Sequence, residues 1–166
     1  EVDQEYINAL NTALPNIPCS KVRFKDVPLK SFSIDNNIVK SKVFMRYRGY
    51  CDTHWYTKQK SIKIKIKNKK IYGYSTFNLN AMATDPLLTD QLFGEILTKM
   101  GNISTRIKLV RLFINGKDNG VRQLVQNIDE DLIINSNRKL GSIYRERAHA
   151  YLGDNSEVWK LKTKWK

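Results

Sequence analysis

Alternation of isoleucine and lysine constrains the fold of this sequence more than any other feature. The alternating residues are Ile62, Lys63, Ile64, Lys65, Ile66 and Lys67. Successive side chains of a strand point to opposite faces of a sheet, so this segment predicts a half-buried strand with one apolar and one basic face. A preceding strand is expected over Val39–Arg48. It ends at Gly49, which can turn the chain with positive φ, and a long loop then joins the two strands of the hairpin.

Other short apolar segments bounded by turn residues predict further strands. The segments are Lys21–Phe24, Ser31–Asp35, Thr76–Leu79, Arg106–Asn115, Val121–Ile128 and Ser142–Arg147. Asn115-Gly116 and Asn119-Gly120 are both turn signals, and they favour antiparallel pairing of the strands on either side. We therefore expect a mostly antiparallel sheet of about five to seven strands.

Helical spacing of apolar residues appears in three places. Asp3–Leu14 predicts a short helix, and the acids at the start of Asp129–Ile134 suit the amino end of another. The strongest pattern is Pro86–Met100, with Asp85 as N-cap and Gly101 as C-cap. Its apolar stripe is expected to lie on the sheet, which predicts an α+β fold with one main helix packed on it.

The 166 residues suit one domain, or one lobe of a larger protein. We expect a connector helix and short strands in residues 1–38, an α+β lobe in residues 39–147, and a basic aromatic tail in residues 148–166. Because the chain begins with Glu1 and has no initiator methionine, it is expected to be a processed product or a segment of a longer polypeptide.

A net charge of +13 favours acidic partners. Nucleic acid is one alternative, with the basic face of Lys58–Lys70 on the phosphates and Tyr72 and Tyr74 stacking on bases. It ranks last, because the lysines alternate on one face without interleaved aromatic residues. No apolar run reaches the roughly 20 residues of a membrane span, so no span is expected.

The cysteines and histidines form no ligand motif. Cys19 and Cys51 are too few for a metal site, and their pairing as a disulfide stays open. His54 and His149 lack ligand spacing, so each is expected to be a surface or packed histidine. No metal ligand is named.

The order of several motifs resembles the CotH family, the spore-coat-type atypical protein kinases, over roughly Val39 to Thr163. The segments that carry the resemblance are Met45–Gly49, Lys58–Lys65, Leu87–Gly101, Leu112–Val121, Ile143–Arg145 and Leu161–Thr163. The first is similar to the R-x-R-G turn of the family, the second to its K-K-S-Y-x-I-K strand, and the fourth to its L-Y-I-N-G-x-Y-x-G-V hairpin.

This resemblance implies a kinase-like amino-terminal lobe that roofs a site for ATP and magnesium. The loop that begins at Arg48 and Gly49 would then cover phosphates. Lys60 would pair with phosphate oxygens, and Glu95 would orient that lysine from the helix. The catalytic carboxylates of the family would lie in a second lobe, outside this chain.

Departures from the family pattern favour assembly over catalysis. Bulky or acidic residues follow Gly49, where a backbone that approaches phosphate needs small ones, and Gln126 replaces a family Glu. We therefore predict a structural module of a larger virion or cell-surface protein, with other protein chains as partners and ATP binding as the alternative. The predicted partner contacts are Tyr50, Trp55, Tyr56, Trp159 and Trp165.

Overall fold

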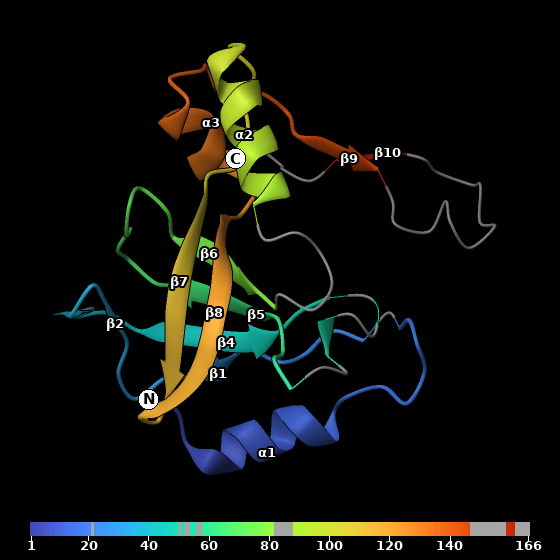
Figure 1. Ribbon diagram of the computed structural model, residues 1–166, viewed down its shortest axis with the longest axis vertical. Coiled ribbons are helices and arrows are strands. Elements are labelled where there is room, and N and C mark those ends of the chain that lie inside the picture. Colours follow the sequence, from blue (N-terminus) through green and yellow to red (C-terminus); the bar gives the residue numbers. More distant parts are fainter. Residues whose placement is uncertain are drawn as a thin grey trace. The chain divides into compact units, whose positions relative to one another are not determined.

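The chain forms two compact units, Glu1–Asn127 and Ile128–Lys166, and most residue contacts lie within one unit or the other. The computed structural model describes residues 1–20, 22–49, 51, 54–55, 58–81, 88–146 and 159–161. Figure 1 shows the elements of both units. The predicted boundaries at residues 38 and 147 stay predictions.

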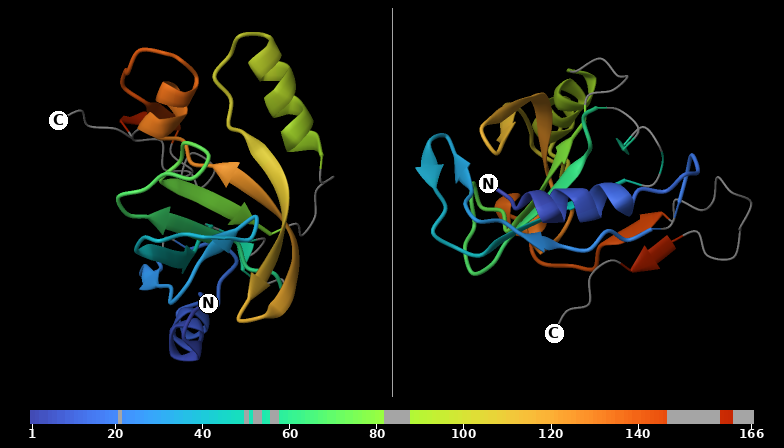
Figure 2. Two further views of the ribbon diagram at one scale, coloured as in Figure 1. Left: turned by 90° about the vertical axis from the view of Figure 1, so that its left-hand side faces the viewer. Right: turned by 90° about the horizontal axis from the view of Figure 1, so that it is seen from below.

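One six-stranded antiparallel sheet forms the first unit, in the order β1-β4-β5-β6-β8-β7. The strands are β1 (Val27–Pro28), β4 (Val43–Tyr47), β5 (Ile62–Ile66), β6 (Thr76–Asn80), β7 (Ile107–Ile114) and β8 (Lys117–Gln126). Strands β7 and β8 cross β4, β5 and β6 steeply in both views of the sheet (Figures 1 and 2). The predicted α+β class and the antiparallel sheet are confirmed.

The alternation in β5 builds the core as predicted. Ile62, Ile64 and Ile66 are buried, and they face Tyr47, Met45 and Val43 on β4. On the other side, Phe77 and Leu79 of β6 continue the same apolar face, and Leu124 of β8 lies opposite Leu79. Each buried side chain of this size contributes about 1.5–3 kcal/mol.

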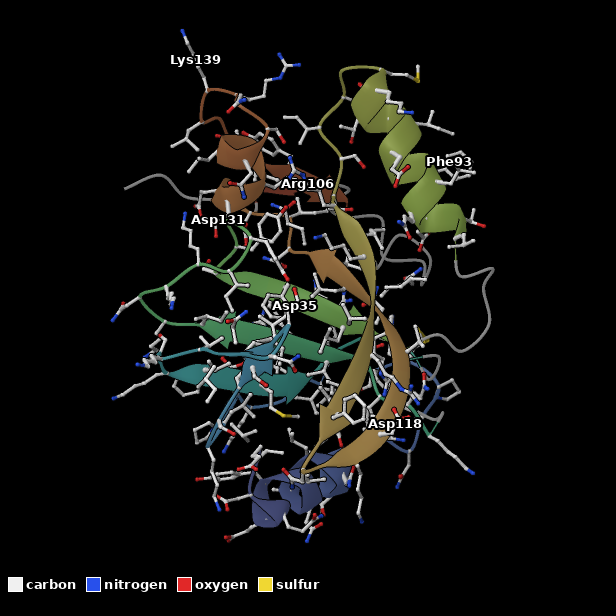
Figure 3. The ribbon with its side chains drawn as sticks, turned by 60° about the vertical axis from the view of Figure 1, so that its left-hand side comes forward. Asp35, Phe93, Arg106, Asp118, Asp131 and Lys139 are labelled. Atoms are coloured by element: carbon white, nitrogen blue, oxygen red, sulfur yellow. A yellow bond between two sulfur atoms is a disulfide. The ribbon has the colours of Figure 1, made fainter. Side chains whose placement is uncertain are left out.

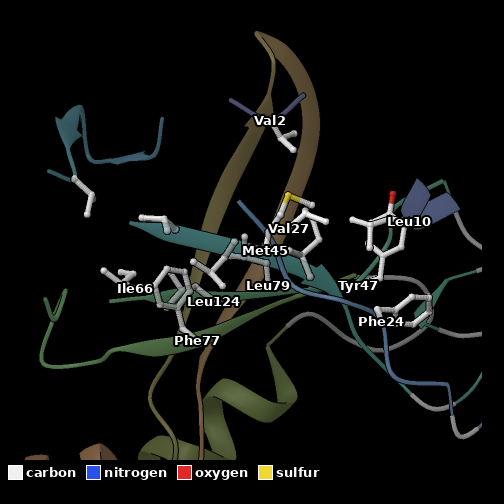
Figure 4. Close-up of a cluster of buried hydrophobic side chains, with 14 of the residues drawn as sticks. Val2, Leu10, Phe24, Val27, Met45, Tyr47, Ile66, Phe77, Leu79 and Leu124 are labelled. Carbon is white, nitrogen blue, oxygen red and sulfur yellow. The ribbon is translucent and has the colours of Figure 1, made fainter. Parts of the chain in front are cut away.

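The amino-terminal segment covers this apolar face (Figure 4). Helix α1 (Gln4–Thr12) contributes Leu10, and Val2, Phe24 and Val27 join the same core. The Tyr47 hydroxyl donates to Asn11 Oδ1 at 2.9 Å, which connects β4 to α1. The predicted helix over Asp3–Leu14 is therefore confirmed, with shorter bounds.

One strand prediction and one turn prediction need correction. The prediction of a strand over Lys21–Phe24 is wrong, because the described residues 22–24 belong to no strand. Instead β2 (Ser33–Ile34) pairs with β3 (Asn37–Ile38) through a two-residue turn. The turn predicted at Asn119-Gly120 does not form. It lies within β8 at a register shift opposite Arg111 and Phe113, where Gly120 has φ +77°.

Asn115-Gly116 forms the β7–β8 turn as predicted, with φ values of +50° and +75°. The two-residue loop sets the start of β8 at Lys117, four residues earlier than expected. Asn115 also holds the start of the chain, since its amide group exchanges hydrogen bonds with both the N–H and the C=O of Val2 at 2.8 Å.

Helix α2 (Thr89–Lys99) is the main departure from expectation. It ends as predicted at Gly101, which has φ +81°, and the Asn102 N–H donates to the Leu97 carbonyl at 2.9 Å. The predicted caps Asp85 and Pro86 lie outside the described residues. However, α2 has no buried residue, so the expectation that its apolar stripe packs on the sheet is wrong.

The second unit contains α3 (Glu130–Asn135) and a two-stranded antiparallel sheet of β9 (Tyr144–Glu146) and β10 (Trp159–Leu161). The predicted helix near Asp129 and the predicted strand near Ser142 are confirmed. The tail was not expected to form a strand, but Trp159 pairs in register with Glu146.

Candidate functional site

Two of the predicted nucleotide-binding residues, Arg48 and Gly49, follow the end of β4, at the edge of the sheet where β5 begins and β6 ends. Arg48 follows β4, and its backbone N–H donates to the Ser61 carbonyl at 2.9 Å. Its guanidinium donates to the side-chain oxygen of Asn80 at the end of β6. Burial lowers the pKa of Arg48, and the nearby charge of Arg46 lowers it further. Arg48 is therefore held by neighbouring protein groups.

A buried hydroxyl connects the loop between β4 and β5 to this edge. Ser61 is 0% exposed, and its Oγ accepts a hydrogen bond from the Ala81 N–H at 2.9 Å. The same Oγ lies 3.1 Å from His54 Nδ1, and the Ser61 N–H donates to the His54 carbonyl at 2.8 Å. Burial lowers the pKa of His54, and the charge of Arg48 lowers it further, which favours the neutral ring; a hydrogen bond joins its Nδ1 to the Ser61 hydroxyl.

Gly49 allows His54 to lie against the loop backbone. It has φ +118°, and an added Cβ would stand 2.1 Å from His54 Cβ. No other residue type fits this position without moving the imidazole. His54 is thus packed, as predicted, and the glycine is explained by this close approach.

A disulfide joins Cys19 to Cys51, the question that the sequence left open. The two residues also form an isolated antiparallel bridge. The disulfide attaches the loop after Gly49 to the amino-terminal segment, and the described residues contain no free cysteine.

The prediction that Trp55 contacts a partner is wrong. Trp55 is 1% exposed, and its ring packs edge-on against Phe24 with 6.1 Å between ring centroids. Although Trp55 lies in a polar loop, burial of its large apolar ring in the core is favourable. Tyr50, Tyr56 and Trp165 lie outside the described residues, and only the backbone of Trp159 is described.

Lys60 and Glu95 are not brought together in the part of the chain that the structure describes. Lys60 is half-buried before β5, and burial lowers the pKa of its ammonium. Glu95 is exposed on α2. No ion pair between them is found in the described ranges, although such a pair would orient the lysine.

A buried arginine holds the segment that carries Lys60. Arg122 on β8 is 1% exposed, and its Nη1 donates to Gln59 Oε1 at 2.9 Å. A Cβ at Gly120 would stand 2.4 Å from Gln59 Nε2, so the Gln59 side-chain amide occupies space that only a glycine leaves open. Sequence reasoning missed Arg122. Its position could have indicated burial, because Arg122, Leu124 and Gln126 occupy every second position of β8 and therefore share one face.

The comparisons with known proteins bear on this arrangement. The family model described as CotH kinase protein matches residues 45–164, which is more than half of the 166 residues. The chain belongs to the CotH kinase family. A search of curated proteins finds no match. The predicted resemblance over roughly Val39 to Thr163 is therefore confirmed.

In this CotH-family chain, three of the motif segments lie on strands of the six-stranded sheet. The segment Met45–Gly49 ends β4, Lys58–Lys65 leads into β5, and Leu112–Val121 spans the β7–β8 turn. At this edge, Arg48 and Ser61 come from motif segments, whereas Asn80 and His54 lie between those segments.

The described parts of this CotH-family chain contain neither a cluster of metal ligands nor a membrane-spanning helix. Among those residues, no group of three or more His, Cys, Asp or Glu side chains is placed to hold a metal ion. In the same ranges, no helix is both long and apolar enough to cross a bilayer.

Part of the basic strand face is paired within the CotH-family chain itself. Asp26 pairs with Lys65 and also with Arg46, whose Nε lies 3.2 Å from its carboxylate. Tyr74 is buried, so the expectation that it stacks on a base is wrong. Tyr72 donates to the Asp35 carboxylate, and Lys108 Nζ lies 4.5 Å from its ring centroid.

Proposed function

We propose that this CotH-family domain is an assembly module that binds an acidic partner protein along the apolar side of α2. The observation that carries the proposal is that α2 exposes large apolar side chains along its whole length. These residues, called the α2 stripe below, are Leu88, Leu92, Phe93, Ile96, Leu97 and Met100. Contiguous exposed apolar surface of this kind is typical of protein interaction sites.

The orientation of α2 supports this proposal. Gly94 lies on the side of the helix away from the centre of the α2 stripe, since each residue turns the helix by about 100°. An added Cβ at Gly94 would stand 3.2 Å from the Thr105 carbonyl oxygen and 3.3 Å from Ser104 Oγ. The helix therefore contacts its own unit through a small residue, and Phe93 projects away from the sheet (Figure 3).

Charge indicates which kind of partner would fit. The chain carries a net charge of +13, so a second copy would be repelled as it approaches. An acidic protein would be attracted by the same field, and it would gain apolar contact area once docked on the α2 stripe. We therefore expect a different chain, acidic overall, with apolar side chains that meet α2.

A photo-crosslinking amino acid at position 93 tests the proposal. Replacement of Phe93 by p-benzoylphenylalanine keeps an aromatic side chain, and mass spectrometry then identifies the crosslinked peptides in protein from the native source. The control carries the same group at Tyr6, an exposed residue of α1. Helices α1 and α2 lie at opposite ends of the first unit (Figure 2).

The expected result is one crosslinked acidic chain from position 93 and none of that chain from position 6. Crosslinks from position 93 that stay within its own chain, join two copies or fail to form would overturn the proposal.

A second candidate function is nucleotide binding at the edge that contains Arg48, Gly49 and Lys60. The observation in its favour is that Arg48 and Lys60 lie among the residues that the family model matches and flank the same end of β4 and β5, where Lys60 is half-buried. In this proposal, Lys60 would bind phosphate oxygens and Glu95 would reach it only after α2 moves. The missing ion pair between the two ranks this candidate second.

Calorimetry with ATP and magnesium tests this second candidate. Lys60→Ala removes the proposed phosphate ligand, and Lys58→Ala removes an exposed lysine two residues away. Binding that is lost only in Lys60→Ala would establish nucleotide recognition. If the unaltered protein binds no ATP, or if both variants lose it equally, nucleotide binding at this edge is excluded.

A further inference from the structure

A hollow opens where β4 begins and β5 ends, at the end of these strands that is remote from Gly49. Its volume is about 510 Å³, and its lining is Lys40, Ser41, Lys42, Lys67, Asn68 and Lys69. We call it the lysine hollow. Sites for small ligands commonly have volumes of about 300–1,000 Å³, so it has room for a compact molecule. Strand β4 begins directly after Lys42, and its start is the tail of the β4 arrow in Figure 1.

Four of the six lining residues are exposed lysines, and none is acidic. In the described ranges, no ion pair is found for Lys40, Lys42, Lys67 or Lys69. Lys65, two residues before Lys67, shows the contrast because it is paired with Asp26. Like charges that share a hollow repel each other, and an anion placed among them relieves that repulsion.

The backbone fixes both sides of the lysine hollow. The Lys67 N–H donates to the Lys42 carbonyl at 2.9 Å, and the Ser41 hydroxyl donates to the Lys67 carbonyl. Asn68 has φ +56°, which turns the chain after β5. The four lysines therefore come from two backbone segments that the sheet holds together before a ligand arrives.

We propose that the lysine hollow binds a compact polyanion that carries several phosphate groups, either free in solution or as the headgroup of a lipid. Several phosphate groups match several ammonium groups, whereas a singly charged anion leaves most of them uncompensated. The Ser41 and Asn68 side chains add polar groups at the same place. This site is separate from the α2 stripe and from the edge at Gly49.

The concave shape and the surrounding aromatic residues favour a compact ligand over a nucleic-acid strand. A strand would follow an extended basic groove and stack its bases on free aromatic faces. Here Tyr74 is buried and the ring of Tyr72 is covered by Lys108. Phe44 likewise has Lys67 Nζ 5.2 Å from its ring centroid.

Binding is tested by calorimetry with inorganic triphosphate, and by sedimentation with phosphatidylcholine vesicles that contain or lack phosphatidylinositol bisphosphate. The test variant Lys42→Gln/Lys67→Gln removes two charges from the lysine hollow. The matched control Lys117→Gln/Lys139→Gln removes two charges from exposed lysines elsewhere. The melting temperature of each variant shows that it is folded.

We expect saturable binding in at least one arm, weakened about tenfold or more in the test variant and much less in the control. Triphosphate binding would identify a free ligand, and binding only to the phosphoinositide vesicles would identify a headgroup. No binding in either arm, equal weakening in both variants, or tighter binding of a short single-stranded oligonucleotide would overturn the proposal.

Discussion

The imidazole of His54 occupies the space that a side chain at Gly49 would need. The backbone of Gly49 also has φ +118°, so the position is restricted both by conformation and by contact. Gly101, at the end of α2, has φ +81°, but no atom lies within 4 Å of an added Cβ. These two glycines therefore separate the cost of backbone strain from the cost of the contact.

Gly49→Ala is expected to lower the free energy of unfolding by about 2–4 kcal/mol, and Gly101→Ala by about 1 kcal/mol. Urea denaturation of the two variants measures the difference. If both variants lose the same amount, the His54 contact contributes nothing and the packing of the loop is misassigned.

The ionisation of His54 predicts how stability depends on pH. Burial and the charge of Arg48 lower its pKa in the folded state, whereas the unfolded chain has the ordinary value near 6.5. The unfolded state therefore binds the proton first as the pH falls. The free energy of unfolding should decrease from about pH 7 downward, before the carboxylates begin to titrate.

Urea denaturation at a series of pH values measures this decrease. His54→Gln is expected to flatten the profile between about pH 7 and 5.5. A profile that His54→Gln leaves unchanged would rule out His54 as the origin of the decrease.

Two phenylalanines test whether the α2 stripe is free of contacts within the chain. Phe77 is 2% exposed in the core, and Phe93 is 60% exposed on α2. Phe77→Ala is expected to cost about 3–5 kcal/mol of unfolding free energy, and Phe93→Ala less than about 0.5 kcal/mol. Thermal and urea unfolding compare them. A loss of several kcal/mol in Phe93→Ala would mean that the chain covers its own α2 stripe.

The disulfide closes a loop between residues that are 32 positions apart. Replacement of both Cys19 and Cys51 by alanine should lower the free energy of unfolding by about 3–4 kcal/mol, because the unfolded chain regains the entropy of the open loop. Reductant should destabilise the unaltered protein by a similar amount and leave the double variant unaffected. An unaltered protein that is insensitive to reductant would argue against the bond.

Sequence patterns predicted the sheet well because local rules govern its strands. The alternation at Ile62, Ile64 and Ile66 fixes which face is buried, and Asn115-Gly116 fixes the β7–β8 turn. Asn119-Gly120 was misassigned because a glycine with positive φ serves a bulge as readily as a turn.

The site was harder to predict, since its residues are placed by contacts distant in the sequence. Trp55 lies in a polar loop, yet the core formed with Phe24 buries it. The helical spacing of apolar residues in α2 indicated an apolar side, but not whether the sheet would cover that side. Arg122 was overlooked because its partner Gln59 is 63 residues away. The order of motifs indicated the family, but it did not indicate these contacts.

Because Cys19 and Cys51 are bonded, the backbone between them forms a covalent ring together with the disulfide. A protease that cuts once inside this ring would leave two polypeptides still attached to each other. They would migrate as one species until a reductant separates them. The contribution of α1 to the core, through Leu10, would therefore survive a nick that would otherwise release the amino-terminal segment.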